Sequence, residues 1–324
     1  MIQATADRLT GLADEDQLYV ITGQQYAGLT ADQLPQMPAE NILVEPSGRN
    51  TAPAIGLACI HLLRRDPDAI MAIFPADHVI TQTDAFQIAV RRGIEAAQAG
   101  HLVTLGIEPT EPHTGYGYIK RAALVQPTEG EKPAIFAVDN FLEKPDRVRA
   151  EGFLDEGGYY WNGGIFISRA DAMLDEIARQ MPEMHRALRT ISDALDGPQS
   201  VAVLVREWSQ MPSTSIDYGI MEGARQVAVV PLNAGWNDVG SWDALESLLT
   251  ADATGNITIG DDIVSVESQG NITYGNHRLI ALVGVTDLIV VDTGDAVLIG
   301  HRDHMQKVKD VVDMVKTRQR DDLL

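Results

Sequence analysis

Two aspartates, Asp77 and Asp238, combine a residue type and a position that suit metal chemistry. Asp77 closes the apolar run of residues 69–78, where a buried strand of a parallel sheet would end. Asp238 lies much later, in the stretch Trp236-Asn-Asp-Val-Gly-Ser-Trp. Ligands of open α/β sheets bind beyond the carboxyl ends of the strands, and carboxylates there suit a divalent metal that holds phosphate oxygens. We therefore expect both aspartates to bind one Mg²⁺ ion; the alternative is that each is an ordinary turn residue.

The segment Glu45-Pro-Ser-Gly-Arg-Asn-Thr-Ala-Pro joins an expected strand to an expected helix. Asn50 and Thr51 are good helix-capping residues, so a polar strand-to-helix turn is one interpretation. Gly48 admits close approach of a ligand to the backbone, and amides at a helix start bind phosphates. These features favour the second interpretation, which is a site for a base or a phosphate.

Three further segments carry polar groups that suit a sugar phosphate. Two glycines interrupt the strand-like stretch 115–119, and glycine in a strand often marks the close approach of a ligand. Lys144 suits a phosphate and Glu143 suits sugar hydroxyls, although an acid beside a base is usually a solvated ion pair. The amide of Asn162 both donates and accepts, as vicinal hydroxyls require. Each segment alone is a weak signal, and their joint occurrence is a stronger one.

The elements that must position these residues alternate along the first third of the chain. Strands are expected at residues 17–22, 41–45, 70–74 and 102–107, and helices at residues 1–12, 23–34, 52–65 and 84–99. Such alternation predicts an α/β domain with a right-handed, mostly parallel sheet. The middle third is mixed, with strand-like stretches at residues 115–119, 134–143 and 161–167 and helical ones at residues 170–181 and 184–195.

The pattern changes from residue 256 onward. Short β runs separated by Gly, Asn and Asp recur about every ten residues, which predicts a β-rich module, and a last helix carries Val308, Val311, Val312 and Val315. We place the boundary near Ala251, which gives domains of residues 1–250 and 251–324.

Composition excludes several classes of partner. With 46 acidic against 25 basic residues, the formal charge of −21 opposes non-specific contact with nucleic acid or anionic lipid. The apolar runs are strand-sized and too short to cross a membrane, and no secretory leader is recognisable. The single cysteine, Cys59, lies in an apolar stretch and is expected to be a buried packing residue. We expect a cytoplasmic protein that binds neither nucleic acid nor membrane.

Taken in order, these segments resemble the motifs of the bacterial mannose-1-phosphate guanylyltransferases, members of the sugar-nucleotidyltransferase superfamily. The matches cover nearly the whole chain, and the set is specific although its parts are not. The matching motifs are Glu45-Pro-Ser-Gly-Arg-Asn-Thr-Ala-Pro, Phe74-Pro-Ala-Asp-His, Thr114-Gly-Tyr-Gly-Tyr-Ile, Phe141-Leu-Glu-Lys-Pro, Trp161-Asn-Gly-Gly-Ile-Phe, Ser215-Ile-Asp-Tyr-Gly and Trp236-Asn-Asp-Val-Gly-Ser-Trp.

The resemblance implies transfer of GMP from GTP to α-D-mannose 1-phosphate by a Rossmann-like nucleotidyltransferase domain. It also implies a C-terminal left-handed β-helix used in the contacts of a homodimer. By the same resemblance, Asp77 and Asp238 would hold Mg²⁺, Lys144 would bind the sugar phosphate, Gly48, Arg49, Asn50 and Thr51 would line the guanine pocket, and Gly117, Glu143, Asn162 and Asp217 would contact the sugar.

The front of the chain departs from the family pattern. The family opens with a strand and a Gly-rich loop carrying an Arg and a Pro-Lys pair, and neither precedes the helix expected at residues 1–12. We therefore expect an N-terminally truncated chain, or a mis-assigned start, that folds poorly and turns over little. Two alternatives stay open, namely a nucleotidyltransferase for another sugar phosphate or nucleotide and a degenerate paralogue that binds a GDP-sugar or regulates an active subunit.

Overall fold

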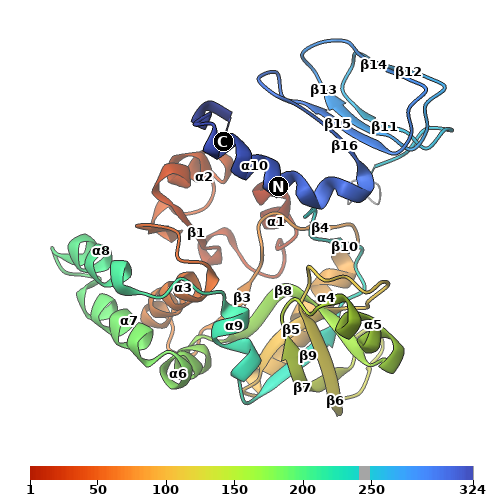
Figure 1. Cartoon of the computed structure of the whole chain (residues 1–324). Coiled ribbons are helices and arrows are strands. Elements are labelled where there is room, and N and C mark those ends of the chain that lie inside the picture. Colours follow the sequence, from red (N-terminus) through yellow and green to blue (C-terminus); the bar gives the residue numbers. More distant parts are fainter. Residues whose placement is uncertain (241–248, 324) are drawn as a thin grey trace. The chain divides into compact units, whose positions relative to one another are not determined.

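The structure is a computed structural model that describes residues 1–240 and 249–323 (Figure 1). Contacts divide the chain into two units, Met1–Trp236 and Asn237–Leu324. The domain boundary expected near Ala251 stays a prediction. No helix among the described residues is both long enough and apolar enough to cross a membrane.

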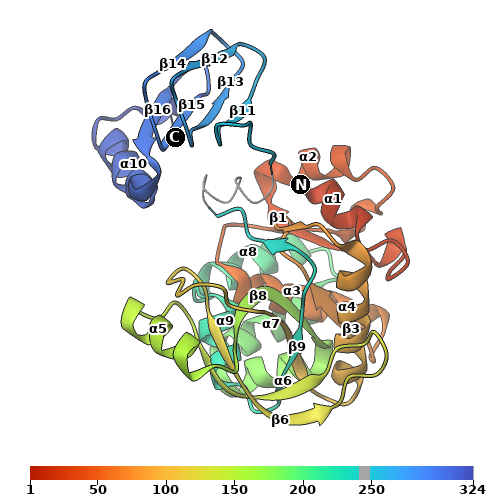
Figure 2. The same cartoon turned by 90° about the vertical axis from the view of Figure 1, so that its right-hand side faces the viewer.

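A six-stranded sheet forms the centre of the first unit, in the strand order β3-β8-β5-β9-β7-β6, and its strands are labelled in Figure 1. Figure 2 shows the cartoon turned by 90°. Strands β5 and β9 are parallel neighbours, and the other neighbouring pairs are antiparallel; β6 and β7, for example, follow each other through a short connection that permits only a hairpin. The sheet is therefore mixed, although its α/β class is as expected. The strands are β3 (Ile70–Ile73), β5 (Leu102–Ile107), β6 (Tyr118–Gln126), β7 (Ile135–Leu142), β8 (Tyr159–Arg169) and β9 (Val227–Pro231).

Alternating side chains divide the interior of this unit into two cores, because successive residues of a strand point to opposite faces. Leu102 and Phe166 belong to a core shared with α3, α6 and α7, whereas Val103 and Ile167 belong to a core shared with α4. Cys59 is fully buried in α3, as expected. The helices are α1 (Ile2–Asp7), α2 (Ala27–Gln33), α3 (Thr51–Arg65), α4 (Thr83–Gln98), α5 (Arg147–Glu156), α6 (Ala170–Gln180), α7 (Pro182–Ala194), α8 (Ser200–Gln210) and α9 (Ile216–Gly219).

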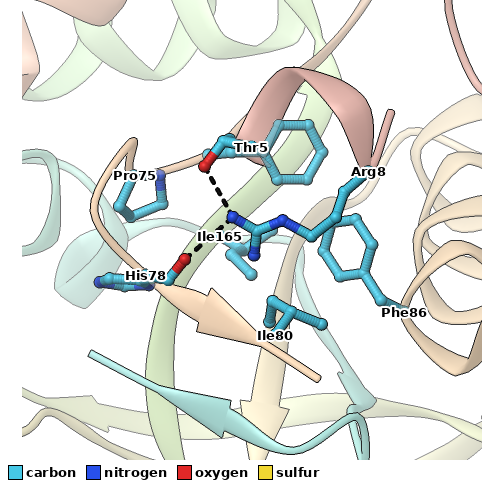
Figure 3. Close-up of a pocket in the computed structure, with 8 residues that line it drawn as sticks. Thr5, Arg8, Pro75, His78, Ile80, Phe86 and Ile165 are labelled. Atoms are coloured by element: carbon cyan, nitrogen blue, oxygen red, sulfur yellow. Dashed lines mark hydrogen bonds between the residues drawn. The ribbon is translucent and has the colours of Figure 1, made fainter. Parts of the chain in front are cut away.

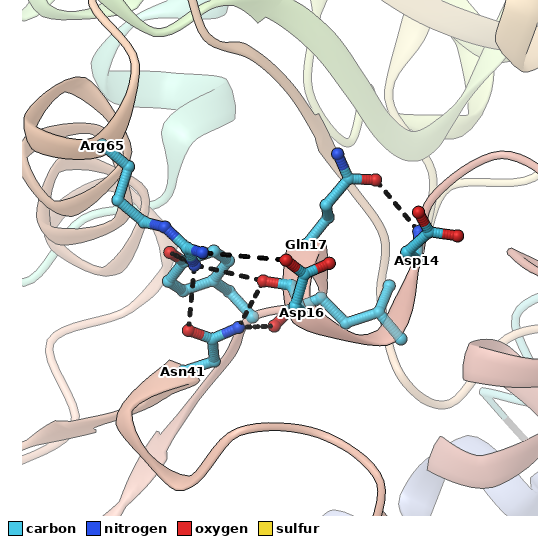
Figure 4. A network of polar contacts seen from close by, with 7 residues as sticks. Asp14, Asp16, Gln17, Asn41 and Arg65 are labelled. Carbon is cyan, nitrogen blue, oxygen red and sulfur yellow. Dashed lines mark hydrogen bonds and ion pairs between the residues drawn. The ribbon is translucent and has the colours of Figure 1, made fainter.

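A separate parallel pair, β1 (Val20–Gly23) and β2 (Ile42–Glu45), leads into α3. A polar network holds the beginning of this pair (Figure 4). The buried Asn41 donates to the carbonyls of Asp16 and Leu18 at 2.9 and 2.8 Å, and Arg65 donates to the Tyr19 hydroxyl at 2.6 Å. The last turn of α3 is thereby fastened to the segment that leads into β1.

The second unit is built mainly of stacked parallel strands, with β16 antiparallel to β15, which confirms the expected β-rich module. β11, β13 and β15 pair in parallel, as do β12 and β14, so the chain alternates between two sheets as it winds. Buried asparagines link the successive coils, since Asn271 donates to Asn256 Oδ1 at 3.0 Å and accepts from the Leu288 amide at 2.9 Å. The elements are β11 (Ile257–Ile259), β12 (Ile263–Val266), β13 (Ile272–Gly275), β14 (Ile280–Val283), β15 (Leu288–Asp292), β16 (Val297–His301) and α10 (Val308–Thr317).

Candidate functional site

Four residues expected to contact a sugar lie together in the first unit. Gly117 directly precedes β6, Glu143 directly follows β7, Asn162 lies on β8, and Asp217 lies on α9. Strands β6 and β8 pair with Tyr118 opposite Trp161, so the backbone amide of Asn162 donates to the Gly117 carbonyl at 2.8 Å. The sequence suggested that Gly115 and Gly117 lie inside a strand, but they do not. Residues 114–116 form bends, and β6 begins only at Tyr118. We call these four residues the sugar cluster.

The side chain of Asn162 connects the sugar cluster. Its Nδ2 donates to Asp217 Oδ1 at 2.7 Å, and its Oδ1 accepts from the Gly164 amide at 3.1 Å and from Thr104 Oγ1 at 3.3 Å. These partners fix which end of the amide carries the nitrogen, because Asp217 only accepts when it is ionised. Burial raises the pKa of Asp217, while the bond from Asn162 stabilises its charge.

Glu143 has a carboxylate oxygen without a partner. Its Oε2 is buried and accepts no hydrogen bond from any described residue. Burial, together with the charge of Asp217, raises the pKa of Glu143 to about 7. A Cβ added at Gly117 would collide with this oxygen and would lie 3.2 Å from the Cβ of Asn162. Glycine at 117 thus leaves room beside an unpaired acceptor, and an unpaired buried acceptor calls for a donor such as a hydroxyl.

Lys144 and Glu222 complete the surroundings of Glu143. The Lys144 Nζ lies 3.7 Å from Glu143 Oε1 with its side chain 58% exposed, and its φ of 48° is uncommon for a residue other than glycine. Glu222 Oε1 accepts from the Glu143 amide at 3.0 Å. Glu222 was missed by the sequence reasoning, and only its nearness to the Ser215 motif could have suggested it.

The four residues expected to line the guanine pocket lie in sequence before and at the start of α3, but their side chains hold the loop itself. Asn50 caps the helix by accepting from the Thr51 amide at 2.8 Å, and Thr51 Oγ1 accepts from the Ile216 amide at 2.8 Å. Arg49 donates to the carbonyls of Met211 and Ser209 at 3.0 and 2.9 Å. Gly48 is exposed, and a Cβ there would meet nothing within 4 Å.

Residues 208–216, of which the sequence motifs include only Ser215 and Ile216, support this loop. The Trp208 indole, which is fully buried, donates to the Ser47 carbonyl at 2.7 Å, and the Ala52 amide donates to the Thr214 carbonyl at 3.1 Å. The apolar pattern of α8 gives a weak signal, because Val201 and Val205 point outward and are 72% and 50% exposed. We call residues 208–216 the supporting segment.

Asp77 lies in an exposed turn after β3, and its carboxylate makes no hydrogen bond or ion pair with any other described residue. Its turn is held from several sides. The carbonyl of Ala76 accepts from Thr5 at 3.3 Å. The carbonyl of His78 accepts from Arg8 at 2.9 Å (Figure 3). His78 Nδ1 accepts from the Trp236 indole at 3.1 Å, so His78 is hydrogen-bonded and packed.

Asp238 belongs to the second unit, so the structure does not describe the distance between its carboxylate and that of Asp77. Asp238 Oδ1 accepts from the Gly240 amide at 3.2 Å, as in an aspartate turn. Trp242, the second tryptophan of this stretch, lies outside the described residues. No three His, Cys, Asp or Glu side chains within the described ranges group as a complete metal site.

Two family models match the chain. A model described as nucleotidyl transferase matches residues 1–255, and one described as MannoseP isomerase/GMP-like beta-helix domain matches residues 261–315. A crystal structure of mannose-1-phosphate geranyltransferase from Thermus thermophilus is similar over 97% of this chain and 89% of that chain, with a TM-score of 0.85 and 31% identity.

Curated relatives agree with these matches. The xanthan biosynthesis protein XanB of Xanthomonas campestris pv. campestris (strain B100) is 42% identical over 99% of this chain and 67% of that protein. The mannose-1-phosphate guanylyltransferase of Escherichia coli (strain K12) is 41% identical over 98% of this chain and 66% of that protein. The chain spans about two thirds of the length of these relatives. It therefore belongs to the nucleotidyl transferase family, among the mannose-1-phosphate guanylyltransferases.

Proposed function

We propose that the chain transfers GMP from GTP to α-D-mannose 1-phosphate and so produces GDP-mannose and pyrophosphate. A phosphate oxygen of the sugar phosphate attacks the α-phosphorus of GTP, the new P–O bond forms, and the bond to the bridging oxygen of pyrophosphate breaks. No covalent bond to the protein is needed, so the residues contribute mainly by positioning.

The unpaired Oε2 of Glu143 is the observation that carries this proposal. This oxygen lies in the sugar cluster. Among the described residues, the only cation beside it is the exposed Lys144. Sugar hydroxyls can donate to this oxygen and to Asp217, and the side-chain amide of Asn162 keeps Asp217 in place. Lys144 would bind the phosphate at the other end of the same molecule.

The loop at residues 46–50 would bind the guanine moiety largely through its backbone. Arg49, Asn50 and Thr51 are engaged in holding the loop, whereas Gly48 offers exposed backbone with room for close approach. The three side chains thus line the site by shaping it.

Asp77 and Asp238 are our proposed Mg²⁺ ligands. Their donor type fits, because Mg²⁺ is usually bound by one or two carboxylates together with substrate phosphates, and Asp77 has no competing partner among the described residues. The bound ion would neutralise charge on the phosphates. The likeness to the relatives supports Asp238, since the nucleotidyl transferase match extends past it to residue 255.

A nucleotide-exchange assay tests the proposal. Pyrophosphate release should require mannose 1-phosphate and should be fastest with GTP when GTP, ATP and dTTP are compared. Asp77→Asn should lower kcat by about 100-fold or more, the scale of losing a major electrostatic contribution. Asp32→Asn, at an exposed aspartate of α2, is the matched control.

Each other outcome has a meaning. Turnover that prefers another nucleotide or sugar phosphate would replace the substrate, and unchanged release from Asp77→Asn would remove the metal assignment. Binding of GDP-mannose without any turnover would indicate a sugar-nucleotide-binding protein.

A further inference from the structure

Arg8 is a buried cation whose contacts the proposed reaction does not explain. Its residue is 9% exposed, and within the described residues no carboxylate forms an ion pair with it. Its Nη2 donates to Thr5 Oγ1 at 2.6 Å and to the His78 carbonyl at 2.9 Å, and its Nε donates to the Ala4 carbonyl at 3.0 Å. Burial lowers the pKa of Arg8. A buried cation without a counter-ion is costly, so its contacts call for a reason.

These contacts converge on the carbonyls of the two residues that flank Asp77, Ala76 and His78. Arg8 binds the carbonyl of the residue after Asp77, and Thr5 binds the carbonyl of the residue before it, at 3.3 Å. Thr5 also accepts from Arg8, so the two side chains form one clamp. Figure 3 shows the guanidinium of Arg8 between Thr5 and His78.

The clamp is itself anchored to the body of the first unit. Gln87 of α4 donates to the carbonyls of Arg8 and Thr10, both at 2.9 Å. The hollow around Arg8, lined by Pro75, Ile80 and Phe86 among others, has a volume of about 10 Å³, which holds about one water molecule. Arg8 is therefore not placed to bind a substrate in this hollow, and its role is to hold protein.

We propose that Arg8, assisted by Thr5, is a positioning residue that fixes the Asp77 turn and thereby orients the Asp77 carboxylate toward its divalent cation. The inference rests on the proposed function, because it assumes that Asp77 binds the cation. We expect lysine to replace Arg8 poorly, since an ammonium is a compact donor, whereas the planar guanidinium donates to Ala4 from Nε and to Thr5 and His78 from Nη2.

The test measures binding of Mn²⁺, a spectroscopic substitute for Mg²⁺, by electron paramagnetic resonance in the presence of GTP. Arg8→Lys should weaken Mn²⁺ binding about 10-fold, the lower end of the effect of residues that orient metal ligands. Thr5→Val should weaken it about threefold, because the bonds of Thr5 to Ala76 and Arg8 are lost while the bond from Arg8 to His78 remains. Arg91→Lys is the matched control, because Arg91 also binds a carbonyl of the N-terminal segment, Gly11 at 2.9 Å, but does not contact the Asp77 turn.

A combined variant separates positioning from a loss of stability. With Asp77→Asn in place, Arg8→Lys should weaken Mn²⁺ binding no further, because the carboxylate it orients is gone. An Arg8→Lys effect that equals that of Arg91→Lys, or that persists fully beside Asp77→Asn, would overturn the inference. If the unaltered chain binds Mn²⁺ and GTP but Asp77→Asn binds the ion equally well, the proposed metal assignment fails instead.

Discussion

The sugar cluster and the loop at residues 46–50 are both connected to the same stretch of chain around α9, but in different ways. The sugar cluster receives a side chain, Asp217, whereas the loop mostly receives backbone groups of the supporting segment. In the cluster an acceptor is left unpaired, and in the loop the polar side chains are engaged with the protein. The comparison teaches that a polar motif can serve a ligand or its own scaffold, and that only unpaired buried groups distinguish the two.

Asn162→Leu should break the sugar cluster and leave the loop intact. The variant removes one donor to the partly buried carboxylate of Asp217, which costs roughly 1–3 kcal/mol. We expect the KM for mannose 1-phosphate to rise about 50-fold and the KM for GTP to change less than twofold. Initial-rate kinetics with each substrate varied will measure both; an equal rise in the two constants would contradict the separation of the two regions.

Two glycine-to-alanine substitutions, one in each region, compare the sugar cluster with the loop at residues 46–50. Gly117→Ala places a Cβ against Glu143 Oε2 and should raise the KM for mannose 1-phosphate about 10-fold. Gly48→Ala meets open space, so it should leave the melting temperature unchanged and alter only GTP binding. Differential scanning calorimetry and the same kinetics distinguish these outcomes. Equal effects of both variants on the sugar phosphate would show that the two sites are not distinct.

Arg49→Lys should test whether the loop side chain serves the scaffold. The guanidinium spans two carbonyls, Met211 and Ser209, which one ammonium cannot do as well. We expect the free energy of unfolding to fall by about 1 kcal/mol. Denaturant unfolding will measure it. Lys144→Gln, at an exposed ammonium of the sugar cluster, is the control and should leave stability nearly unchanged.

Glu143 should contribute to the pH dependence of the free energy of unfolding. Its pKa is about 7 in the folded chain against an ordinary value of 4.5, so the folded state binds the proton more tightly. The stability from this group is present below pH 4.5 and is lost as the pH rises to about 7, by roughly 1 kcal/mol because solvent partly screens the carboxyl. Glu143→Gln should reduce the difference between the free energies of unfolding measured by denaturant at pH 5 and at pH 8. An unchanged difference would place this pH dependence on other groups.

The sequence predicted the elements of the first unit better than their assembly. Glu143 at the end of a strand and Asn162 within one follow from local patterns. Their meeting depends on the β6–β8 pairing, and strand periodicity does not encode which strands pair. The β-rich second unit was predictable, because turn residues between short apolar runs repeat along the chain.

Arg49 illustrates what the sequence could not provide. Its partners are backbone carbonyls, one of them 160 residues away, and a carbonyl leaves no mark on residue type. Arg8 shows the same limit, because its partner at His78 is also a carbonyl. The roles of the site residues expected from the sequence stay proposals, and the structure adds to them Glu222, Trp208 and Arg8 as residues to test.

Lys144 has a further consequence for engineering this protein. Its left-handed backbone is disfavoured by about 1–2 kcal/mol for a residue with a Cβ, and glycine would relieve most of that. Lys144→Gly should therefore give a more stable protein that binds the sugar phosphate more weakly. Selection for heat resistance alone would tend to discard this lysine, so a thermostabilised variant should be screened for turnover at the same time.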